Sequence, residues 1–231
     1  MSLFGQAAVT IWHDLLPQAK EAFYDWHNRE HMPERAGIPG FRRGRRYISV
    51  QGAPEYFNLY EADSPEVLTG QDYLNRLNAP TPWTREVVVS FRDVTRAICR
   101  VVYSAGVGQG GTMLTLRFDV PDAAAASMSD LLRQQVLPLV ADMHGIVGVH
   151  LCRADDAGSR IETAERKARS QETLVPRWVI LVEGISAAAV ALAADALRTA
   201  LADHQPPASD CVLAIYQLEY QRCKLPWGSG G

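Results

Sequence analysis

The chain has 231 residues, of which 47% are hydrophobic and 21% charged, a balance typical of a globular protein that buries a sizeable core. Its formal net charge of -3 provides no basic excess that could neutralise phosphates, so no nucleic-acid partner is expected. No apolar run approaches the roughly 20 residues of a membrane-spanning helix, so no membrane partner is expected either.

The cysteines and the N-terminus indicate the compartment. Four cysteines are spread along the chain without a CxxC pair: Cys99, Cys152, Cys211 and Cys223. This spacing excludes a zinc ribbon and a thioredoxin-type redox motif, and unpaired cysteines are typical of a reducing environment. The first residues lack the basic start of a signal peptide, and His13 and Asp14 interrupt their apolar run. We therefore expect a cytoplasmic protein.

The first elements in chain order are a strand, a helix and two strands. Residues 7–15 are rich in β-forming side chains, and residues 18–32 carry apolar side chains at helical spacing. Residues 41–50 and 55–62 alternate or run apolar as strands do, on either side of a turn that contains Gly and Pro.

A helical segment and a strand complete this group. Ser64 and Pro65 form a helix start, with a capping residue followed by proline at the first helical position. Thr81 and Pro82 repeat the same signal before a strand that includes residues 98–103. The predicted order is strand, helix, strand, strand, helix, strand.

The chain then repeats this order. Helices are predicted over 122–143 and over the Ala-rich stretch 186–204, and a strand over 211–221 closes the second copy. The hydrophilic residues 153–176 have no counterpart in the first copy, so we expect an exposed loop there. Three pairs of identical residues lie 105 positions apart: Thr10 and Thr115, Pro33 and Pro138, and Gly40 and Gly145.

Two copies of a βαββαβ unit predict an α+β fold made of two ferredoxin-like repeats. Their open sheet faces can pack together as a closed α+β barrel, so that the tandem repeat replaces a homodimer. We expect the first repeat over 1–107, the second over 112–223, and a flexible Gly-rich tail over 224–231. Further homodimerisation is left open.

The first predicted helix carries the candidate catalytic residues. His27 and His31 are four positions apart and fall on one helix face, with Trp26 and Glu30 on the adjacent row. An imidazole titrates near neutral pH, so His31 or His27 is a candidate general base. Alternatively, His31 only interacts favourably with the last carbonyls of the helix.

The next strand supplies candidate substrate-binding residues. Arg43, Arg45 and Tyr47 alternate along it and therefore share one face. An enclosed guanidinium needs an anionic partner, which is either a carboxylate of this protein, Glu30 among them, or an anionic group on a ligand. His150 lies 105 positions after Arg45 and is predicted to share the same pocket.

The two copies differ at these positions, because Leu132 and Val136 stand where the first copy has His27 and His31. One polar and one apolar half predict a single pocket for a small anionic or amphipathic organic molecule, lined by Trp26 among others. The two histidines at helical spacing lack the H-E-x-x-H pattern and a third ligand, so neither a metal nor another cofactor is predicted. His13 and Trp12 are placed at a barrel mouth.

The stretch WHNREHMPERAGIPGFRRGRRY, from Trp26 to Tyr47, resembles EthD-like proteins of the dimeric α+β barrel superfamily. In these proteins an aromatic and His-rich helix ends in E-H-x-P and is followed by P-G-F and an R-Y strand. TPWT at 81–84 and the run 91–100 support the resemblance. Its relatives include cofactor-free monooxygenases, lactone isomerases, polyketide cyclases and some haem enzymes, so it implies a small-molecule protein rather than one reaction.

We therefore expect an enzyme that acts on a small oxygenated organic molecule by proton transfer, as an isomerase, cyclase, lyase or cofactor-independent monooxygenase. The alternative is a non-catalytic binding or accessory protein whose His, Glu and Arg side chains form a buried ion network. An open cavity that reaches an imidazole would favour the enzyme.

Overall fold

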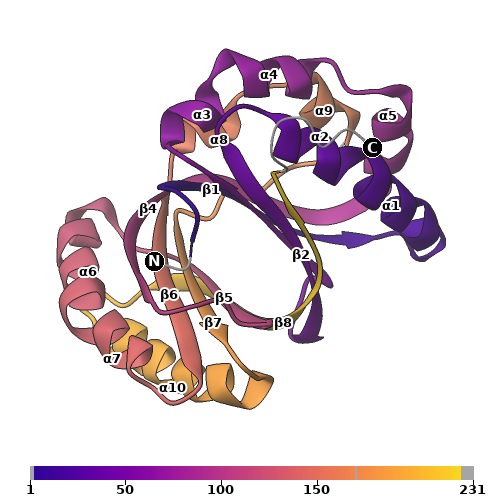
Figure 1. Cartoon of the computed structure of the whole chain (residues 1–231). Coiled ribbons are helices and arrows are strands. Elements are labelled where there is room, and N and C mark those ends of the chain that lie inside the picture. Colours follow the sequence, from indigo (N-terminus) through magenta and orange to yellow (C-terminus); the bar gives the residue numbers. More distant parts are fainter. Residues whose placement is uncertain (1–2, 170, 225–231) are drawn as a thin grey trace.

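The computed structural model describes residues 3–169 and 171–224. Within this part of the chain the strands form one closed antiparallel barrel in the order β1-β3-β2-β8-β5-β7-β6-β4 (Figure 1). The strands are β1 (Ala7–Leu15), β2 (Phe41–Gln51), β3 (Tyr56–Ala62), β4 (Phe91–Gly106), β5 (Thr112–Asp119), β6 (Ile146–Ala154), β7 (Trp178–Gly184) and β8 (Ser209–Cys223).

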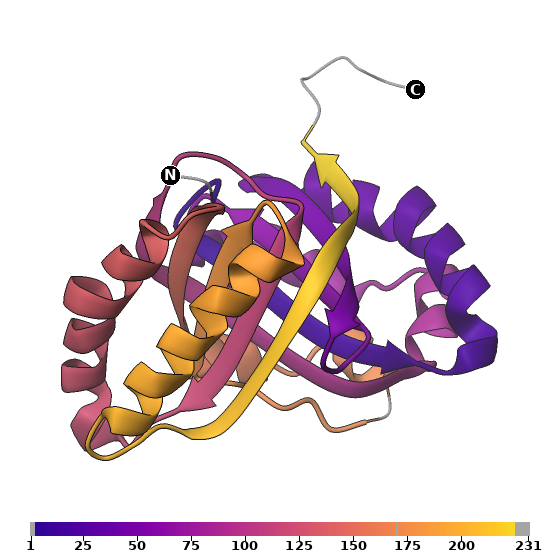
Figure 2. The ribbon, with the colours of Figure 1, turned by 90° about the horizontal axis from the view of Figure 1, so that it is seen from below.

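Strands β1 to β4 and strands β5 to β8 are two βαββαβ halves, so the predicted fold class is confirmed. The halves meet along two seams, β2 with β8 and β4 with β6. Each half covers the outer face of its own sheet with helices, and Figure 2 shows these two helical layers on opposite sides of the barrel.

The helices of the first half are η1 (Pro17–Ala19), α1 (Lys20–Trp26), η2 (His27–His31), α2 (Met32–Gly37), α3 (Pro65–Thr69), α4 (Gln71–Asn78) and α5 (Pro82–Val88). Those of the second half are η3 (Asp122–Ala124), α6 (Ala125–Leu131), η4 (Leu132–Val136), α7 (Leu137–Ala141), α8 (Asp156–Arg160), α9 (Ala164–Ala168) and α10 (Ala187–Asp203). The predicted helix starts hold at α3 and α5, which carry proline at their first positions; Thr81 caps α5 by accepting from the Thr84 N–H, whereas Ser64 makes no side-chain capping hydrogen bond.

A π-helical turn interrupts the first long helix of each half at equivalent positions, η2 in the first and η4 in the second. Each turn is followed by a proline, Pro33 or Pro138, which has no N–H and crowds the carbonyl four residues earlier. The wider π turn accommodates this: the Met32 N–H bonds the carbonyl of His27, and the Leu137 N–H bonds that of Leu132. The repeat therefore preserves a local backbone feature together with its cause.

Alternation along the strands separates two environments. Side chains such as Trp12, Tyr47 and Tyr216 point into the barrel, where they form an apolar cluster with buried Cys99 and Cys152. Side chains on the other face pack under the helices, where the second half builds a large and wholly apolar cluster. The barrel lumen is thus filled with side chains.

The hydrophilic segment 153–176 was predicted to be an exposed loop, and this prediction is wrong. It contains α8 and α9, which leave the second half and pack beside the helices of the first half (Figure 1). The Ser159 hydroxyl accepts a hydrogen bond of 2.9 Å from the Ile98 N–H, and Glu165 and Arg169 are buried. Ion pairs such as that between Glu165 and Arg35 hold polar residues of this segment in buried positions, so their polarity did not indicate exposure.

Both ends of the described chain are tied to the barrel. Leu3 is buried in the lumen cluster, and the Lys224 N–H donates to the Arg42 carbonyl over 3.0 Å. The rest of the predicted tail, 225–231, lies outside the described residues. Within 3–169 and 171–224, none of the helices has both the length and the apolarity needed to cross a bilayer.

Candidate functional site

The predicted site residues fall on both sides of β2. Arg43, Arg45 and Tyr47 point into the lumen, whereas Arg46 points outward to the helices that carry His27. The imidazoles and the two lumen guanidiniums therefore do not share a pocket, and the prediction of one joint pocket is wrong. Strand alternation divides the residues into a lumen cluster and an outer cluster.

In the lumen cluster the guanidiniums bind the protein's own carboxylates. Arg43 pairs with Glu61 at 2.7 Å, and Arg45 pairs with Glu61 at 2.9 Å and with Glu183 at 2.9 Å. The anionic partners of these arginines are thus Glu61 and Glu183, not Glu30. These charges sit almost completely out of solvent, which is tolerable only because each is paired.

His150, which the sequence predicted to share a pocket with Arg45, lies in the same ion-paired cluster. Its Nε2 lies 3.5 Å from Glu183, and its Nδ1 lies 2.9 Å from the Ser104 hydroxyl. Burial alone would raise the pKa of Glu183, but the hydrogen bond with His150 and the charge of Arg45 outweigh it and hold that pKa at about 2. Glu183 is therefore ionised at neutral pH and fixes Arg45 in place.

The N-terminal segment closes this end of the barrel. The Phe4 N–H donates to Glu61 over 2.7 Å, and the Arg43 guanidinium lies 4.4 Å from the centre of the Phe4 ring. Tyr47 is fully buried, and burial raises the pKa of its phenol. The charged groups of the lumen cluster are ion-paired, while the Tyr47 hydroxyl and Arg45 Nε have no hydrogen-bond partner within the described part of the chain.

The outer cluster lies between η2 and the sheet of the first half. His27 Nδ1 is 2.9 Å from an Arg46 nitrogen, which can only donate, so this ring nitrogen is the acceptor. Its Nε2–H therefore faces the Tyr60 hydroxyl at 3.2 Å. Arg46 also donates to Asn28 over 2.8 Å and to Glu219 over 2.7 Å. The tautomer and orientation of His27 are fixed by these partners.

His31 lies deeper in the same layer. Its ring stacks 5.5 Å from that of His27 and lies 4.3 Å from the indole of Trp26, while its Nδ1 is buried without a hydrogen-bond partner. It borders an enclosed cavity of about 20 Å³, where Asn58 Oδ1 and Arg169 Nε are likewise without partners. A cavity of this size holds about one water molecule. Three residues that line this cavity thus each carry a buried polar atom without a hydrogen-bond partner among the described residues.

A third imidazole belongs to this layer and was misplaced from the sequence. His13 was expected with Trp12 at a barrel mouth, but adjacent strand residues point to opposite faces, so only Trp12 enters the lumen. The His13 ring stacks 4.2 Å from Phe91, and its Nε2 lies 3.0 Å from Asn58 Nδ2. The alternation of β1 was the signal that could have placed it.

Burial keeps all three imidazoles neutral. It lowers the pKa of His13 to about 3 and holds the pKa of His27 and of His31 well below the usual 6.5. Secondary contributions come from the other imidazoles and from nearby guanidiniums, among them Arg35 and Arg46. Each ring therefore carries one unprotonated nitrogen at neutral pH; in His27 and His13 this nitrogen already accepts, from Arg46 and from Asn58.

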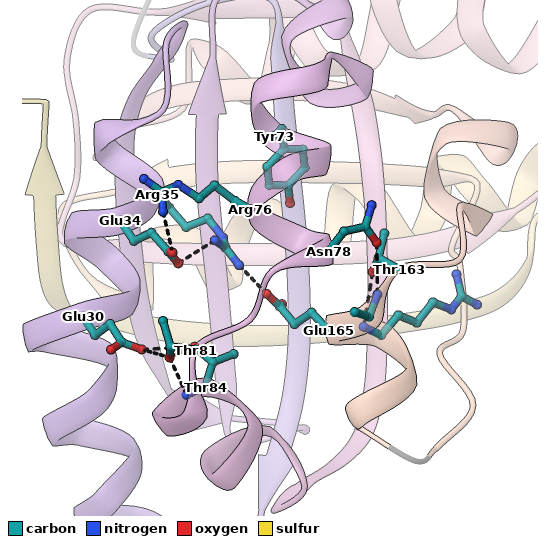
Figure 3. A network of polar contacts seen from close by, with 12 residues as sticks. Glu30, Glu34, Arg35, Tyr73, Arg76, Asn78, Thr81, Thr84, Thr163 and Glu165 are labelled. Atoms are coloured by element: carbon teal, nitrogen blue, oxygen red, sulfur yellow. Dashed lines mark hydrogen bonds and ion pairs between the residues drawn. The ribbon is translucent and has the colours of Figure 1, made fainter.

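Glu30 does not border the cavity. It accepts hydrogen bonds from the hydroxyls of Thr81 at 2.6 Å and Thr84 at 3.1 Å, at the start of α5 (Figure 3). Trp26 donates from its indole to the Thr84 hydroxyl over 3.1 Å and borders the cavity with its ring. Glu30 thus positions α5 and, through Thr84, the indole beside His31.

Helix α9 covers the cavity, an arrangement that sequence reasoning missed. Glu165 binds Arg35 and lies 3.2 Å from Arg169, and Figure 3 shows it reaching from α9 toward Arg35 and Glu34. These partners are far apart in sequence, so no local pattern announced them. Tyr60 and Asn58 were missed because strand β3 reads as an ordinary buried strand.

The outer cluster lacks the features of a metal or haem site. Among residues 3–169 and 171–224, no three His, Cys, Asp or Glu side chains converge as metal ligands. The cavity beside His27 and His31 has room for a water molecule and none for a porphyrin, so haem does not fit the site as it stands. The residues that line the cavity carry imidazoles (His27 and His31), a phenol (Tyr60) and a guanidinium (Arg169).

No family model and no curated protein matches the sequence. Solved structures match nearly all of it. An anthrone oxidase-like protein matches with a TM-score of 0.63 at 12% identity, over 95% of this chain and 93% of its own. Candidate monooxygenases from Fusobacterium nucleatum subsp. nucleatum and Lactobacillus acidophilus match with TM-scores of 0.57 and 0.58, each at 9% identity, over 96% and 95% of this chain and 96% and 97% of theirs. The chain therefore has the dimeric α+β barrel fold, with both halves in one polypeptide.

Proposed function

We propose that the protein is an enzyme that removes a proton from a small oxygenated organic molecule in the outer cluster, as the first step of a cofactor-independent oxidation. The observation that carries the proposal is the unpartnered Nδ1 of neutral His31 beside an enclosed cavity. A buried acceptor without a partner costs stability, so the site gains from a guest that supplies a proton.

Two likenesses support this choice of reaction. Structures with the same fold are described as monooxygenase candidates and as anthrone oxidase-like. The resemblance of residues Trp26 to Tyr47 to EthD-like proteins points to the same class of small oxygenated compounds. We therefore infer a substrate with an acidic C–H conjugated with an aromatic ketone, and anthrone, whose methylene carbon lies across the central ring from its carbonyl, is the probe.

The residues divide the chemistry between them. His31 Nδ1 accepts the proton from carbon, and the unpartnered Nε–H of Arg169 donates to the oxyanion that forms on the ketone. The resulting anion passes electrons to dioxygen. For anthrone, one oxygen atom becomes the second quinone carbonyl, and the other leaves as water with the two hydrogens of the methylene carbon.

Substrate entry requires the cover to move, because about 20 Å³ admits water and not a tricyclic molecule. Glu165 and Arg169 belong to the insertion that contains α9, and the buried ion pair between Glu165 and Arg35 joins α9 to the first-half helices. Displacing this segment would expose His31 and Asn58 together. Closure over the substrate would then exclude bulk water from the anion.

The test is oxygen consumption and anthraquinone formation with anthrone as the probe, measured above the spontaneous rate. The wild-type protein is expected to accelerate both, and His31→Leu to lose a factor of about 10²–10⁴, the usual contribution of a general base. Val136→Leu, which alters the equivalent position of the second half, should keep the full rate. An unchanged rate in His31→Leu, or no acceleration by the wild-type protein, would overturn the oxidation proposal.

The second candidate is a non-catalytic small-molecule-binding or accessory protein. The packed and fully ion-paired lumen around Arg43, Arg45 and Glu183 favours it, because that half of the predicted site has no room for a substrate. An accessory protein would leave anthrone oxidation at the spontaneous rate.

A further inference from the structure

The other end of the barrel carries a guanidinium that the proposed reaction does not use. Arg117 lies on β5 with its side chain in the lumen, 4.7 Å from the ring centre of Trp12. It is 7% exposed, and among the described residues its guanidinium has neither a hydrogen bond nor an ion pair. A buried charge without a partner is costly, and the lumen arginines at the opposite end are all paired.

Arg117 borders an open groove of about 640 Å³, which we name the Arg117 groove. It lies where β1 and β5 end, β4 and β8 begin, and the β2–β3 turn passes. Its apolar walls are Ala53, Pro54, Val94, Leu174 and Val212. This volume suits a small organic ligand. The groove is separate from the cavity at His31, whose lining residues it does not share.

The charges around the groove narrow the ligand class. Asp14, Asp93 and Glu172 also line it, and none lies within ion-pair distance of Arg117. Asp14 already accepts the N–H of Glu55 over 2.5 Å. Several carboxylates repel a polyanion such as a phosphate ester, whereas one buried guanidinium beside apolar walls favours a single carboxylate on an apolar body.

We propose that the Arg117 groove is a binding site for an aromatic monocarboxylate, whose carboxylate takes the free edge of Arg117 and whose ring lies on the apolar wall. The Arg117 guanidinium lies over the indole of Trp12, and this contact holds the guanidinium in position beside the groove. Burial lowers the pKa of Arg117, but an arginine stays charged at neutral pH, so the anchor persists.

The test is isothermal titration with 2-naphthoate, benzoate and inorganic phosphate. We expect saturable one-to-one binding of both carboxylates, tighter for 2-naphthoate, and no saturable binding of phosphate. Arg117→Met should weaken carboxylate binding at least tenfold, while Arg133→Met, an exposed change of equal charge on η4, should leave it unchanged. His31→Leu should also bind normally, which separates this site from the proposed catalysis.

A second variant keeps the test independent of Arg117→Met folding. Val212 is 41% exposed on the groove wall, and Val212→Trp should fill the groove and abolish binding without touching the guanidinium. Arg117→Met should also melt no lower than the wild-type protein, because it removes an unpaired buried charge. Absence of saturable carboxylate binding, equal binding by Val212→Trp, or phosphate binding as tight as that of 2-naphthoate would overturn the proposal.

Discussion

The two helix–sheet layers of the barrel share a backbone and differ in chemistry. Each places a π-helical turn, His27–His31 or Leu132–Val136, against its own sheet. The first layer holds imidazoles, guanidiniums and a phenol where the second holds only hydrocarbon and aromatic side chains. The pairs are His13 and Phe118, His27 and Leu132, His31 and Val136, Arg35 and Val140, Arg46 and Leu151, Asn58 and Ile180, and Tyr60 and Val182.

The apolar layer shows what this fold needs for packing alone. Burying polar groups costs free energy that only good partners recover, and His31 Nδ1 and Asn58 Oδ1 lack partners. The polar layer is therefore the less stable solution to the same packing problem. The proposed reaction would account for this loss of stability, and the apolar packing of the second half offsets it.

The largest effect is expected from removing the acceptor chemistry of the first layer. The double variant His27→Leu/His31→Leu gives this layer the apolar character of its counterpart and should reduce anthrone oxidation to the spontaneous rate. The readout is oxygen uptake by folded protein, with circular dichroism to confirm the fold. Retention of the wild-type rate would show that the polar and apolar layers are equivalent in function.

The cover over the polar layer should depend on Glu165. Glu165→Gln removes the charge that binds buried Arg35 and Arg169, and breaking a buried pair costs about 3–5 kcal/mol. Faster proteolysis within 155–177 and a lower urea midpoint are expected. Glu162→Gln is the matched control, because this exposed carboxylate pairs only at 3.9 Å and is worth close to zero. Equal behaviour of both variants would exclude α9 as an anchored cover.

The three neutral imidazoles should make the protein sensitive to acid. Their folded pKa values lie below the unfolded value of 6.5, so the unfolded chain binds more protons as pH falls. Stability is therefore complete above pH 6.5 and declines below it, by up to about 1.4 kcal/mol per histidine for each pH unit.

Urea unfolding at pH 7.5, 6.5 and 5.5 measures this decline. Replacing His13, His27 and His31 by their second-half counterparts should flatten the profile, because Phe118, Leu132 and Val136 do not titrate. A wild-type profile that is already flat between pH 7.5 and 5.5 would contradict the neutral state of the three rings.

Much of the fold could be predicted because sequence repeats and local residue patterns determine it. The shared offset of Thr10 and Thr115 and of Pro33 and Pro138 located the repeat, and strand alternation and helix starts located the elements. Alternation also placed Arg43 and Arg45 on one face of their strand, but it did not show that this face lines the lumen. Their partners Glu61 and Glu183 come from other strands, and nothing local identified them.

Only part of the outer cluster could be predicted from the sequence. Helical spacing joined His27 to His31, whereas His13, Asn58 and Tyr60 reach them through strand pairing between β1 and β3. The position of α9 over the cavity could not be predicted, because Arg35 and Glu165 are 130 residues apart and charged side chains are ordinarily expected at the surface. Long-range ion pairs turn hydrophilic sequence into buried structure, and a single sequence does not reveal them.

The most direct test of the difference between the layers is the unfolding free energy of His31→Leu at pH 7.5. Leucine approximates the shape of the imidazole and removes an acceptor that has no partner, so stability should stay equal or rise by about 1–3 kcal/mol. That result would show that His31 is kept at the expense of stability. A loss of more than about 1 kcal/mol would instead make His31 a packing residue and contradict the account.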